Sequence, residues 1–269
     1  MKFSELTRVR RVDQDSFEVE IEPSAFIVRG PNGGYLAALL LRALTERIDD
    51  ASRVPRSLTV HYPSAPAAGP ATITTEVIRA GRSLVTASAR LDQGGKPMAV
   101  ALAAFSPAWD GPAWAQLSPP WVPPVAEVAP RTEPRPLPFL DYWDQRLAIG
   151  EPPESGAERA ETGGWLRLQD QEPIDAIVVA AMADAWLPAV FTKLPTTNPV
   201  PTVDLTIHFR TALPSASAPA GAHVLVRFRN QTSAEGFWEE DGELWAPDGT
   251  LLAQSRQLAI MMPPIVSGI

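Results

Sequence analysis

The sequence predicts an α+β fold built from two similar halves, and three observations support this. An apolar helix over residues 35–48 precedes a run of strand-like segments, and an apolar stretch over 175–191 precedes a second run. The segment LTVHYPSA, which begins at Leu58, returns as LTIHFRTA at Leu205, an offset of 147 residues. Each half also ends in a hairpin turn that leads to a last apolar strand. A helix followed by antiparallel strands is typical of α+β proteins, and the repetition indicates an internal duplication.

Composition narrows the class of protein. The chain has 269 residues, enough for one large domain or two ordinary ones, and 45% of them are hydrophobic, which suffices for a sizeable core. No uninterrupted apolar run has the length of a membrane span, and the N-terminus lacks the apolar region of a signal peptide. Cysteine is absent, so we expect a soluble cytoplasmic protein without disulfides or thiol chemistry. The net charge of −8 argues against a nucleic-acid-binding surface.

The first half begins with strands and continues with one helix. Residues 2–22 alternate weakly between apolar and acidic side chains and predict one or two strands. A turn at Pro31, Asn32, Gly33 and Gly34 follows, in which Asn32 is a candidate N-cap for the apolar helix. The strand-like segments after the helix cover residues 57–64, 70–80, 81–93 and 96–106, and a turn at Gly94 and Gly95 joins the last two.

A proline-rich segment separates the halves. Ten prolines fall between residues 107 and 138, which excludes a central strand or a long helix and predicts an extended linker on the surface. We expect Trp109, Trp114 and Trp121 to hold this linker to the body of the protein. The predicted domains are therefore residues 1–106 and 139–269, with the linker at 107–138.

The second half repeats the order of elements. Strand-like segments at residues 139–150 and 164–169 precede the apolar stretch at 175–191, which is predicted to be a buried helix. The strands predicted after it cover residues 202–210, 222–230, 235–246 and 250–262.

Asp184 is the one charged residue inside the predicted helix at 175–191. An unpaired carboxylate in a core is expensive, so its presence needs a reason. Pro188 follows four residues later and has no N–H, so the carbonyl of Asp184 loses its usual helical partner and the helix should bend or end nearby. Two interpretations stand at this point: an acid satisfied by neighbouring hydroxyls or backbone, or a functional site.

The chain resembles the tandem hot-dog family of acyl-CoA thioesterases, of the thioesterase II type. The resemblance rests on the order and spacing of GGYLAALLLRAL, RAGRSLVTASARLDQGGKPMAVALAAF, ADAWLPAV, TVDLTIHFR and LLAQSRQLAIM. It implies two tandem hot-dog domains, each an antiparallel sheet wrapped around a long central helix. It also implies a small-molecule acyl thioester as substrate, with coenzyme A as part of that substrate and no other cofactor. Because hot-dog units generally associate, we expect a homodimer or a larger homo-oligomer.

The resemblance implies a catalytic trio in the second half: Asp184, Thr202 and Gln257. Thioester hydrolysis needs a positioned water and donors for the developing oxyanion, so Asp can take the proton while Thr and Gln supply orientation. The equivalent positions in the first half hold Ala37, Pro55 and Ala103. A polar set that is present in one copy fits a single active site per chain and favours the catalytic interpretation of Asp184.

Strand alternation complicates the role of Thr202. It places Thr202 on the face opposite Leu205, so contact with the site requires a bend at Pro199 or Pro201. Asp204, two residues beyond Thr202, is the rival carboxylate.

Further residues are candidates for substrate binding. The backbone N–H groups at the helix start, in Gly33, Gly34 and Tyr35, could face the thioester oxygen, although a Gly-Gly pair is also a common turn. Arg82 resembles a family position near the coenzyme, and a solvated arginine at a strand end is the alternative. Glu235 and Glu239 stand where related thioesterases place basic residues, so the carrier thiol stays open.

Several functional classes are disfavoured by missing motifs. Three histidines and no cysteine give no zinc cluster, so we expect no metal. The sequence has no G-x-S-x-G elbow, Walker loop or G-x-G-x-x-G pattern, which disfavours serine hydrolases and nucleotide enzymes. Two alternatives to thioester hydrolysis remain: a hot-dog hydratase or dehydratase acting on an acyl thioester, and a non-catalytic acyl-binding or scaffold protein. We expect an apolar acyl tunnel beside the helix predicted at 175–191 and edge-to-edge pairing of the halves.

Overall fold

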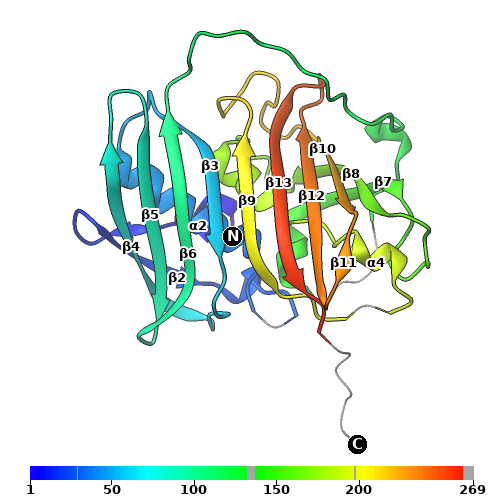
Figure 1. Cartoon of the computed structure of the whole chain (residues 1–269), viewed down its shortest axis with the longest axis horizontal. Helices are drawn as coiled ribbons and strands as arrows, with labels where there is room; N and C mark the ends of the chain where they lie inside the picture. The colour runs from blue at the N-terminus through cyan, green and yellow to red at the C-terminus, as the bar shows by residue number, and fades with distance from the viewer. Residues whose placement is uncertain (29, 132–136, 197, 263–269) are drawn as a thin grey trace, which may run out of the picture.

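One continuous antiparallel sheet dominates the fold (Figure 1). The computed structural model describes residues 1–28, 30–131, 137–196 and 198–262. Within these residues thirteen strands follow the order β1-β2-β4-β5-β6-β3-β9-β13-β12-β10-β8-β7, and β11 pairs with β12. The strands are β1 (Arg10–Arg11), β2 (Ser16–Ile21), β3 (Val54–His61), β4 (Gly69–Ala80), β5 (Val85–Gln93), β6 (Lys96–Ser106), β7 (Trp143–Gly150), β8 (Ala160–Leu168), β9 (Thr202–Phe209), β10 (Val224–Asn230), β11 (Ser233–Ala234), β12 (Phe237–Trp245) and β13 (Leu251–Ile260).

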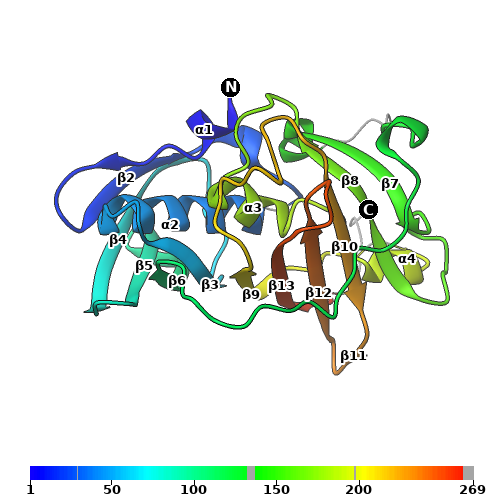
Figure 2. The same ribbon diagram turned by 90° about the horizontal axis from the view of Figure 1, so that it is seen from above.

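The sheet curves around two helices, as Figure 2 shows. The helices are α1 (Phe3–Leu6), α2 (Gly33–Ile48), α3 (Ala176–Met182) and α4 (Val190–Lys193), with short 3-10 helices η1 (Pro23–Ala25), η2 (Val125–Glu127) and η3 (Pro138–Tyr142). Most of α2 and all of α3 are buried, as expected for helices made largely of apolar residues. The predicted N-cap is confirmed, because Asn32 accepts a hydrogen bond from the N–H of Tyr35 at 3.0 Å. In the described part of the chain, no helix combines the length and apolarity needed to cross a membrane.

The strand order confirms the internal duplication. Read outward from the centre, the first half runs β3-β6-β5-β4-β2-β1 and the second runs β9-β13-β12-β10-β8-β7. The halves meet where β3 pairs antiparallel with β9, so the expected edge-to-edge pairing is confirmed. Thr59 lies opposite Thr206, and their hydroxyls are 3.0 Å apart. These two residues are separated by the same 147 positions as the sequence repeat, so equivalent residues of the two copies face each other at the centre.

The second central helix is shorter than the sequence predicts. The apolar pattern predicts a helix over 175–191, whereas α3 ends at Met182 and the chain turns before α4. Asp175 caps the start of α3 by accepting a hydrogen bond from Val178 N at 2.9 Å. Asp184 therefore follows the helix instead of lying inside it. The missing N–H of Pro188 explains why helical bonding does not continue through this turn.

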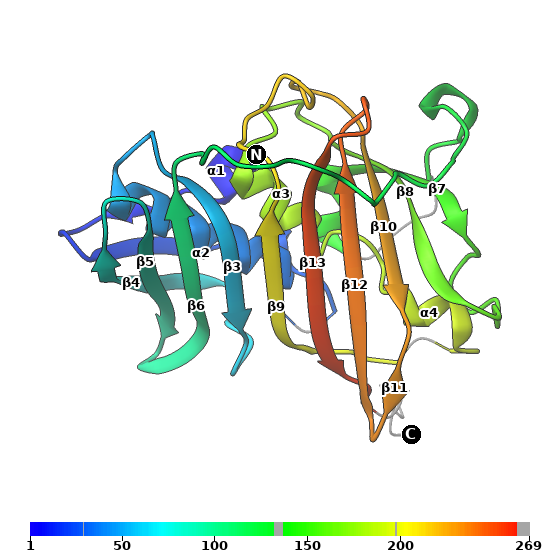
Figure 3. The same cartoon turned by 45° about the horizontal axis from the view of Figure 1, so that its top comes forward.

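The strap, residues 107–131, connects the halves through extended chain (Figure 3). It leaves β6 at Ser106 and passes over the ends of the central strands toward β7. The expectation that its tryptophans hold it to the protein is wrong for Trp114 and Trp121, which are 75% and 88% exposed. Trp109 is 69% exposed, but its indole N–H donates to the hydroxyl of Ser106, the last residue of β6, at 3.0 Å. The predicted domain boundaries around the linker stay a prediction.

Two side chains of the second half hold the later part of the strap. Trp165 of β8 donates its indole N–H to the carbonyl of Pro123 at 2.9 Å. Arg146 of β7 donates to the carbonyls of Val125 and Val128 at 3.1 and 3.2 Å. Proline-rich chain has few N–H groups of its own, so its free carbonyls are the groups through which a neighbour can hold it.

We predict different outcomes for the same change at Trp165 and at Trp121. Trp165→Phe removes the indole donor from Pro123 and should cost about 1 kcal/mol of unfolding free energy. Trp121→Phe changes an exposed side chain and should cost less than about 0.5 kcal/mol. Urea unfolding at neutral pH measures both values, and an equal or larger loss at Trp121 would show that the exposed tryptophans do hold the strap.

Candidate active site

Asp184 lies where the two halves of the chain meet at their helices. Its carboxylate oxygen Oδ2 accepts hydrogen bonds from the backbone N–H of Gly34 at 3.0 Å and from the side-chain amide of Asn32 at 3.1 Å. Both donors belong to the start of α2, in the other half. The first turn of a helix offers unpaired N–H groups and the positive end of the helix dipole, which suit a carboxylate. The site is therefore assembled from both copies of the repeat.

The Gly-Gly pair at the start of α2 permits this contact. A Cβ atom on Gly33 would lie 2.9 Å from Asp184 Oδ2. A Cβ atom on Gly34 would lie 2.6 Å from the carbonyl oxygen of Ala181 and 3.0 Å from the Cβ of Asp184. Any larger residue would push α2 and α3 apart, so these glycines are required by close approach and not only by a turn.

Side chains replace the helical hydrogen bonds that are lost after α3. In a continuous helix the carbonyls of Asp184 and Ala185 would accept from residues 188 and 189. Here Asn32 Nδ2 donates to the Asp184 carbonyl at 2.8 Å, and Gln145 Nε2 donates to the Ala185 carbonyl at 2.6 Å. The N–H of Ala189 donates to a carboxyl oxygen of Glu240 at 2.5 Å. The turn that carries Asp184 is thus held at both ends.

Gln257 and Thr202 lie beside Asp184. Gln257 is 5% exposed on the inner face of β13, and its side-chain amide donates a hydrogen bond to the hydroxyl of Thr202. The same amide lowers the pKa of Asp184, as a hydrogen bond to the ionised carboxylate does. The structure therefore brings the predicted trio together.

A β-bulge, and not a bend at Pro199 or Pro201, turns Thr202 inward. Leu258 pairs with Asp204, whereas the next residue of β13, Ala259, pairs with Thr202, so Val203 is an extra residue on β9. One extra residue reverses the side-chain alternation, which moves Thr202 to the face of Gln257. The carbonyl of Val203 accepts instead from Tyr62 N of the first half, at 3.1 Å.

Burial sets the protonation of Asp184. Removal from water raises the pKa of its carboxyl group from 3.8 to about 6, although the hydrogen bonds from Gly34, Gln257, Gly33 and Asn32 lower it. The residue keeps some exposed surface. The carboxylate is then ionised at neutral pH but takes up a proton when the pH falls by about one unit. This suits a general base.

Two further residues lie at this site and did not stand out in the sequence, Tyr62 and Glu240. The Tyr62 hydroxyl donates to the Gly33 carbonyl at 2.9 Å, and burial together with Asp184 and Asp204 raises the pKa of Tyr62 well above 10. The repeat offered a signal, because the position equivalent to Tyr62 in the second half holds Phe209 and so lacks a hydroxyl.

Glu240 lies directly opposite Gln257 in the pairing of β12 with β13, and it is 5% exposed. Burial, the first cause, raises the pKa of its carboxyl group to about 8. Its position between Trp238 and Gly242 on the inner face of a strand is the sequence signal that could have found it.

The backbone N–H groups at the start of α2 bind protein groups in this structure. The N–H of Gly34 is bonded to Asp184, and the N–H of Tyr35 to Asn32 at 3.0 Å. The Tyr35 side chain is buried, with its hydroxyl 3.3 Å from the Glu20 carbonyl. In this structure these donors hold the carboxylate and the cap, and their contact with a thioester oxygen stays a prediction.

Arg82 is separated from the trio. It is exposed, and its carbonyl accepts from Arg53, which precedes the start of β3. Tyr62 and the trio lie at the opposite end of that strand. The structure does not bring Arg82 to the trio, and its contact with the coenzyme stays a prediction.

The remaining acidic candidates also lie elsewhere. Asp204 pairs with His61 on the outer face of the sheet. The bulge at Val203 changes the side-chain direction of Thr202, which precedes it, but not that of Asp204, which follows it. Glu235 is exposed, and the carboxylate of Glu239 accepts hydrogen bonds from the backbone N–H groups of Gln231 and Thr232. None of these residues contacts Asp184 through a hydrogen bond in the described structure.

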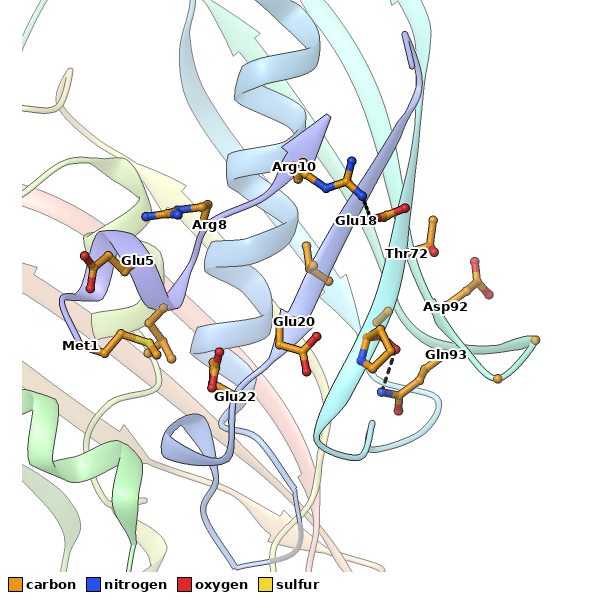
Figure 4. Close-up of a pocket in the computed structure, with 16 residues that line it drawn as sticks. Met1, Glu5, Arg8, Arg10, Glu18, Glu20, Glu22, Thr72, Asp92 and Gln93 are labelled. Atoms are coloured by element: carbon orange, nitrogen blue, oxygen red, sulfur yellow. Dashed lines mark hydrogen bonds and ion pairs between the residues drawn. The ribbon is translucent and has the colours of Figure 1, made fainter. Parts of the chain in front are cut away.

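A surface cavity of about 820 Å³ lies away from the trio (Figure 4). It is bounded by α1, β2, β4 and the β5–β6 turn, and its acidic lining includes Glu18, Glu20 and Asp92. Asp184, Thr202 and Gln257 do not line it. The predicted apolar tunnel beside α3 stays a prediction. Among the described residues, no group of three or more acidic or histidine side chains is placed to hold a metal ion.

Comparison with known proteins places both halves of the chain in related families. Residues 22–106 match the family model of the acyl-CoA thioesterase N-terminal domain, and residues 97–261 match that of the acyl-CoA thioesterase C-terminal domain. Thioesterase-like protein TwmA from Talaromyces wortmannii is 34% identical over 95 residues, which are 35% of this chain and 27% of that protein. The chain thus spans about a quarter of the length of this curated relative.

Solved structures confirm the hot-dog fold over the whole chain. A conserved protein of unknown function with a hot-dog fold from Alicyclobacillus acidocaldarius is 27% identical, covers 98% of both chains and has a TM-score of 0.90. A proposed thioesterase II from Thermobifida fusca YX is 27% identical, covers 97% of both chains and has a TM-score of 0.83.

We predict that Gly34→Ala destabilises the protein by roughly 1–3 kcal/mol. Alanine usually stabilises a helix relative to glycine by about 1 kcal/mol. Here the added Cβ would lie 2.6 Å from a backbone oxygen, and the cost of overpacking exceeds that gain. Urea unfolding measures the change. Gly111→Ala is the control, since nothing lies within 4 Å of its Cβ position, and a stabilised Gly34→Ala variant would contradict the close contact of α2 with α3.

Proposed function

The chain belongs to the acyl-CoA thioesterase family, and on that premise we propose that it hydrolyses acyl-CoA thioesters with Asp184, Thr202 and Gln257. One observation supports this assignment above the others. The half-buried carboxylate of Asp184 lies against the start of α2 and beside the amide of Gln257, which bonds Thr202. A carboxylate, an amide and a hydroxyl in one place can hold a water molecule and remove its proton.

In the proposed reaction, ionised Asp184 accepts a proton from a water molecule that Gln257 and Thr202 orient. The water oxygen forms a bond with the acyl carbon, and the carbonyl oxygen takes the negative charge. The C–S bond then breaks as the charge returns to the carbonyl, and the thiolate leaves. The proton on Asp184 passes to the thiolate or to solvent, which restores the base. A free acid and a free thiol are the products.

The observations favour hydrolysis over the alternatives from the sequence. A hot-dog hydratase or dehydratase would pair its acid with a histidine. The chain has three histidines: His61 and His208 lie on the outer face of the sheet, and His223 contacts Asp144 at 3.0 Å. A non-catalytic acyl-binding protein would bind acyl-CoA without releasing thiol. A cytoplasmic homodimer or larger homo-oligomer stays an expectation from the sequence.

We predict that Asp184→Asn abolishes hydrolysis. Purified protein with a series of saturated acyl-CoA chain lengths and a thiol-trapping dye should release thiol, and Asp184→Asn should lower kcat by roughly 10²–10⁴-fold, since it removes the base. Circular dichroism and urea unfolding check that the variant is folded.

Asp204→Asn is the matched control for this experiment. It changes a carboxylate on the same strand as Thr202 but on the outer face, so it should retain most of the activity. If Asp204→Asn lost activity while Asp184→Asn retained it, the base would be Asp204 and not Asp184. Binding of acyl-CoA without thiol release by the unaltered protein would favour the non-catalytic alternative.

Hydrolysis should require the ionised form of Asp184, whose pKa is raised to about 6. Below that pH the fraction of ionised base falls, so kcat/KM should drop about tenfold per pH unit and should level off above it. Initial rates between pH 4.5 and 7.5 measure this dependence. A rate that is constant from pH 5 to 7.5 would contradict a base with the protonation of Asp184.

A further inference from the structure

Glu240 is a buried acid beside the trio that the proposed reaction does not use. It is 5% exposed on the inner face of β12 and lies directly opposite Gln257 in the strand pairing. Directly paired residues on neighbouring antiparallel strands project from the same face of the sheet. The carboxyl group of Glu240 therefore shares the inner surface with the amide that contacts Asp184.

Glu240 and Gln257 hold the two ends of one short segment. The turn from Asp184 to Ala189 begins at the carboxylate beside Gln257 and ends at the Ala189 N–H, which donates to Glu240 at 2.5 Å. Pro188 prevents this segment from forming its own helical bonds. Without an acceptor from β12, the buried N–H of Ala189 would lack a hydrogen-bond partner. A buried N–H without a partner destabilises the folded state.

The charged groups that act on Glu240 are acidic. Asp184 faces it from the segment after α3, and Glu239 and Asp241 flank it on its own strand. On β13 its direct partner is the neutral Gln257, while Arg256 bonds Asp241 at 3.1 Å on the outer face. On β10, Arg229 bonds Glu243 at 2.9 Å. Lys193 of α4 donates to the carbonyl of Glu158.

This surrounding keeps Glu240 neutral near pH 7. Burial, and then its acidic neighbours, raise the pKa of its carboxyl group from 4.5 to about 8, although the hydrogen bond from Ala189 lowers it. A neutral carboxyl can accept the bond from Ala189 at no electrostatic cost to Asp184. The ionised form would place a second buried negative charge against the first, which is unfavourable in a low-dielectric interior.

We propose that Glu240 is a positioning residue that works only in its protonated form: it holds the segment from Asp184 to Ala189 in place, and its ionisation imposes an alkaline limit on the reaction. This inference rests on the proposed hydrolysis. Asp184 must be ionised and Glu240 must be protonated, so the two acids would bracket the active pH range from opposite sides.

Glu240→Gln is the variant that tests the role of the proton. Glutamine keeps an oxygen that can accept from Ala189 but cannot ionise. With acyl-CoA as substrate, kcat of the unaltered protein should fall about tenfold or more between pH 7.5 and pH 9.5, whereas Glu240→Gln should change less than about twofold over this range. At pH 7.5 the two proteins should differ less than about threefold. Glu240→Ala should lose about tenfold in kcat at pH 7.5, with little change in KM, because Ala189 loses its acceptor.

Glu243→Gln is the matched control. Glu243 is the other buried glutamate of β12, but it binds Arg227 and Arg229 on the outer face. Its variant should keep the alkaline loss of kcat. An alkaline loss in Glu240→Gln equal to that of the unaltered protein would overturn the proposal, and so would a uniform loss of activity in Glu240→Gln at every pH.

Unfolding separates this inference from the proposed function. If the unaltered protein releases no thiol at any pH, the proposed hydrolysis fails, and the proton on Glu240 is still tested by stability. Since its folded-state pKa is raised, the stability that Glu240 contributes is present below pH 4.5 and is lost as pH rises through about 8. The urea midpoint of the unaltered protein should therefore fall relative to that of Glu240→Gln between pH 5 and pH 9. Parallel midpoints would overturn the proposal.

Discussion

The contact between Asp184 and the start of α2 is the constraint on which the rest of the site depends. A carboxylate is placed in a core at a cost, and the N–H groups of the first helical turn offset part of that cost. The contact requires glycine at residues 33 and 34, because a side chain at either would meet Asp184 or Ala181. It also requires α3 to end early, so that Asp184 can leave the helix and face its neighbour. Pro188 and the side chains that satisfy the freed backbone groups provide this break.

The duplication explains both the shape of the site and its asymmetry. Equivalent residues face each other at Thr59 and Thr206, so each half presents its helix to the other across an approximate twofold axis. The backbone fold is the same in both halves, but the polar site residues are not. The second half carries Asp184, Thr202 and Gln257, and the first half contributes the helix start and Tyr62. The candidate site is therefore built from residues of both halves.

Much of the fold followed from the sequence because its signals are local. The last strand, the cap at Asn32 and the repeated LTVH and LTIH segments each depend on neighbouring residues, and the structure confirms the strand, the cap and the repeat. The trio was found by resemblance and by its absence from the first copy. The roles of its members stay a proposal, while their proximity is observed.

What the sequence did not reveal depends on distant contacts. Pro188 indicated a bend or an end of the helix near Asp184, but the apolar pattern of residues 183–191 continues that of α3, so the exact end at Met182 was not visible. The bulge at Val203 leaves no mark on composition, and it decides which way Thr202 faces. Tryptophans usually prefer burial, yet those of the strap are exposed, since extended proline-rich chain is held through its carbonyls. Arg82 lies in the turn between β4 and β5, away from the trio, and its resemblance to a family position near a coenzyme did not reveal this placement.

The strap has an evolutionary consequence. In a dimer of identical subunits, every substitution appears twice, and a change that improves one partner's role also alters its twin. A covalent tether keeps the halves at high effective concentration and lets each accumulate changes alone. The first half could then lose its polar site residues and serve as structural support while the second half kept them. Two identical subunits cannot diverge from each other in this way.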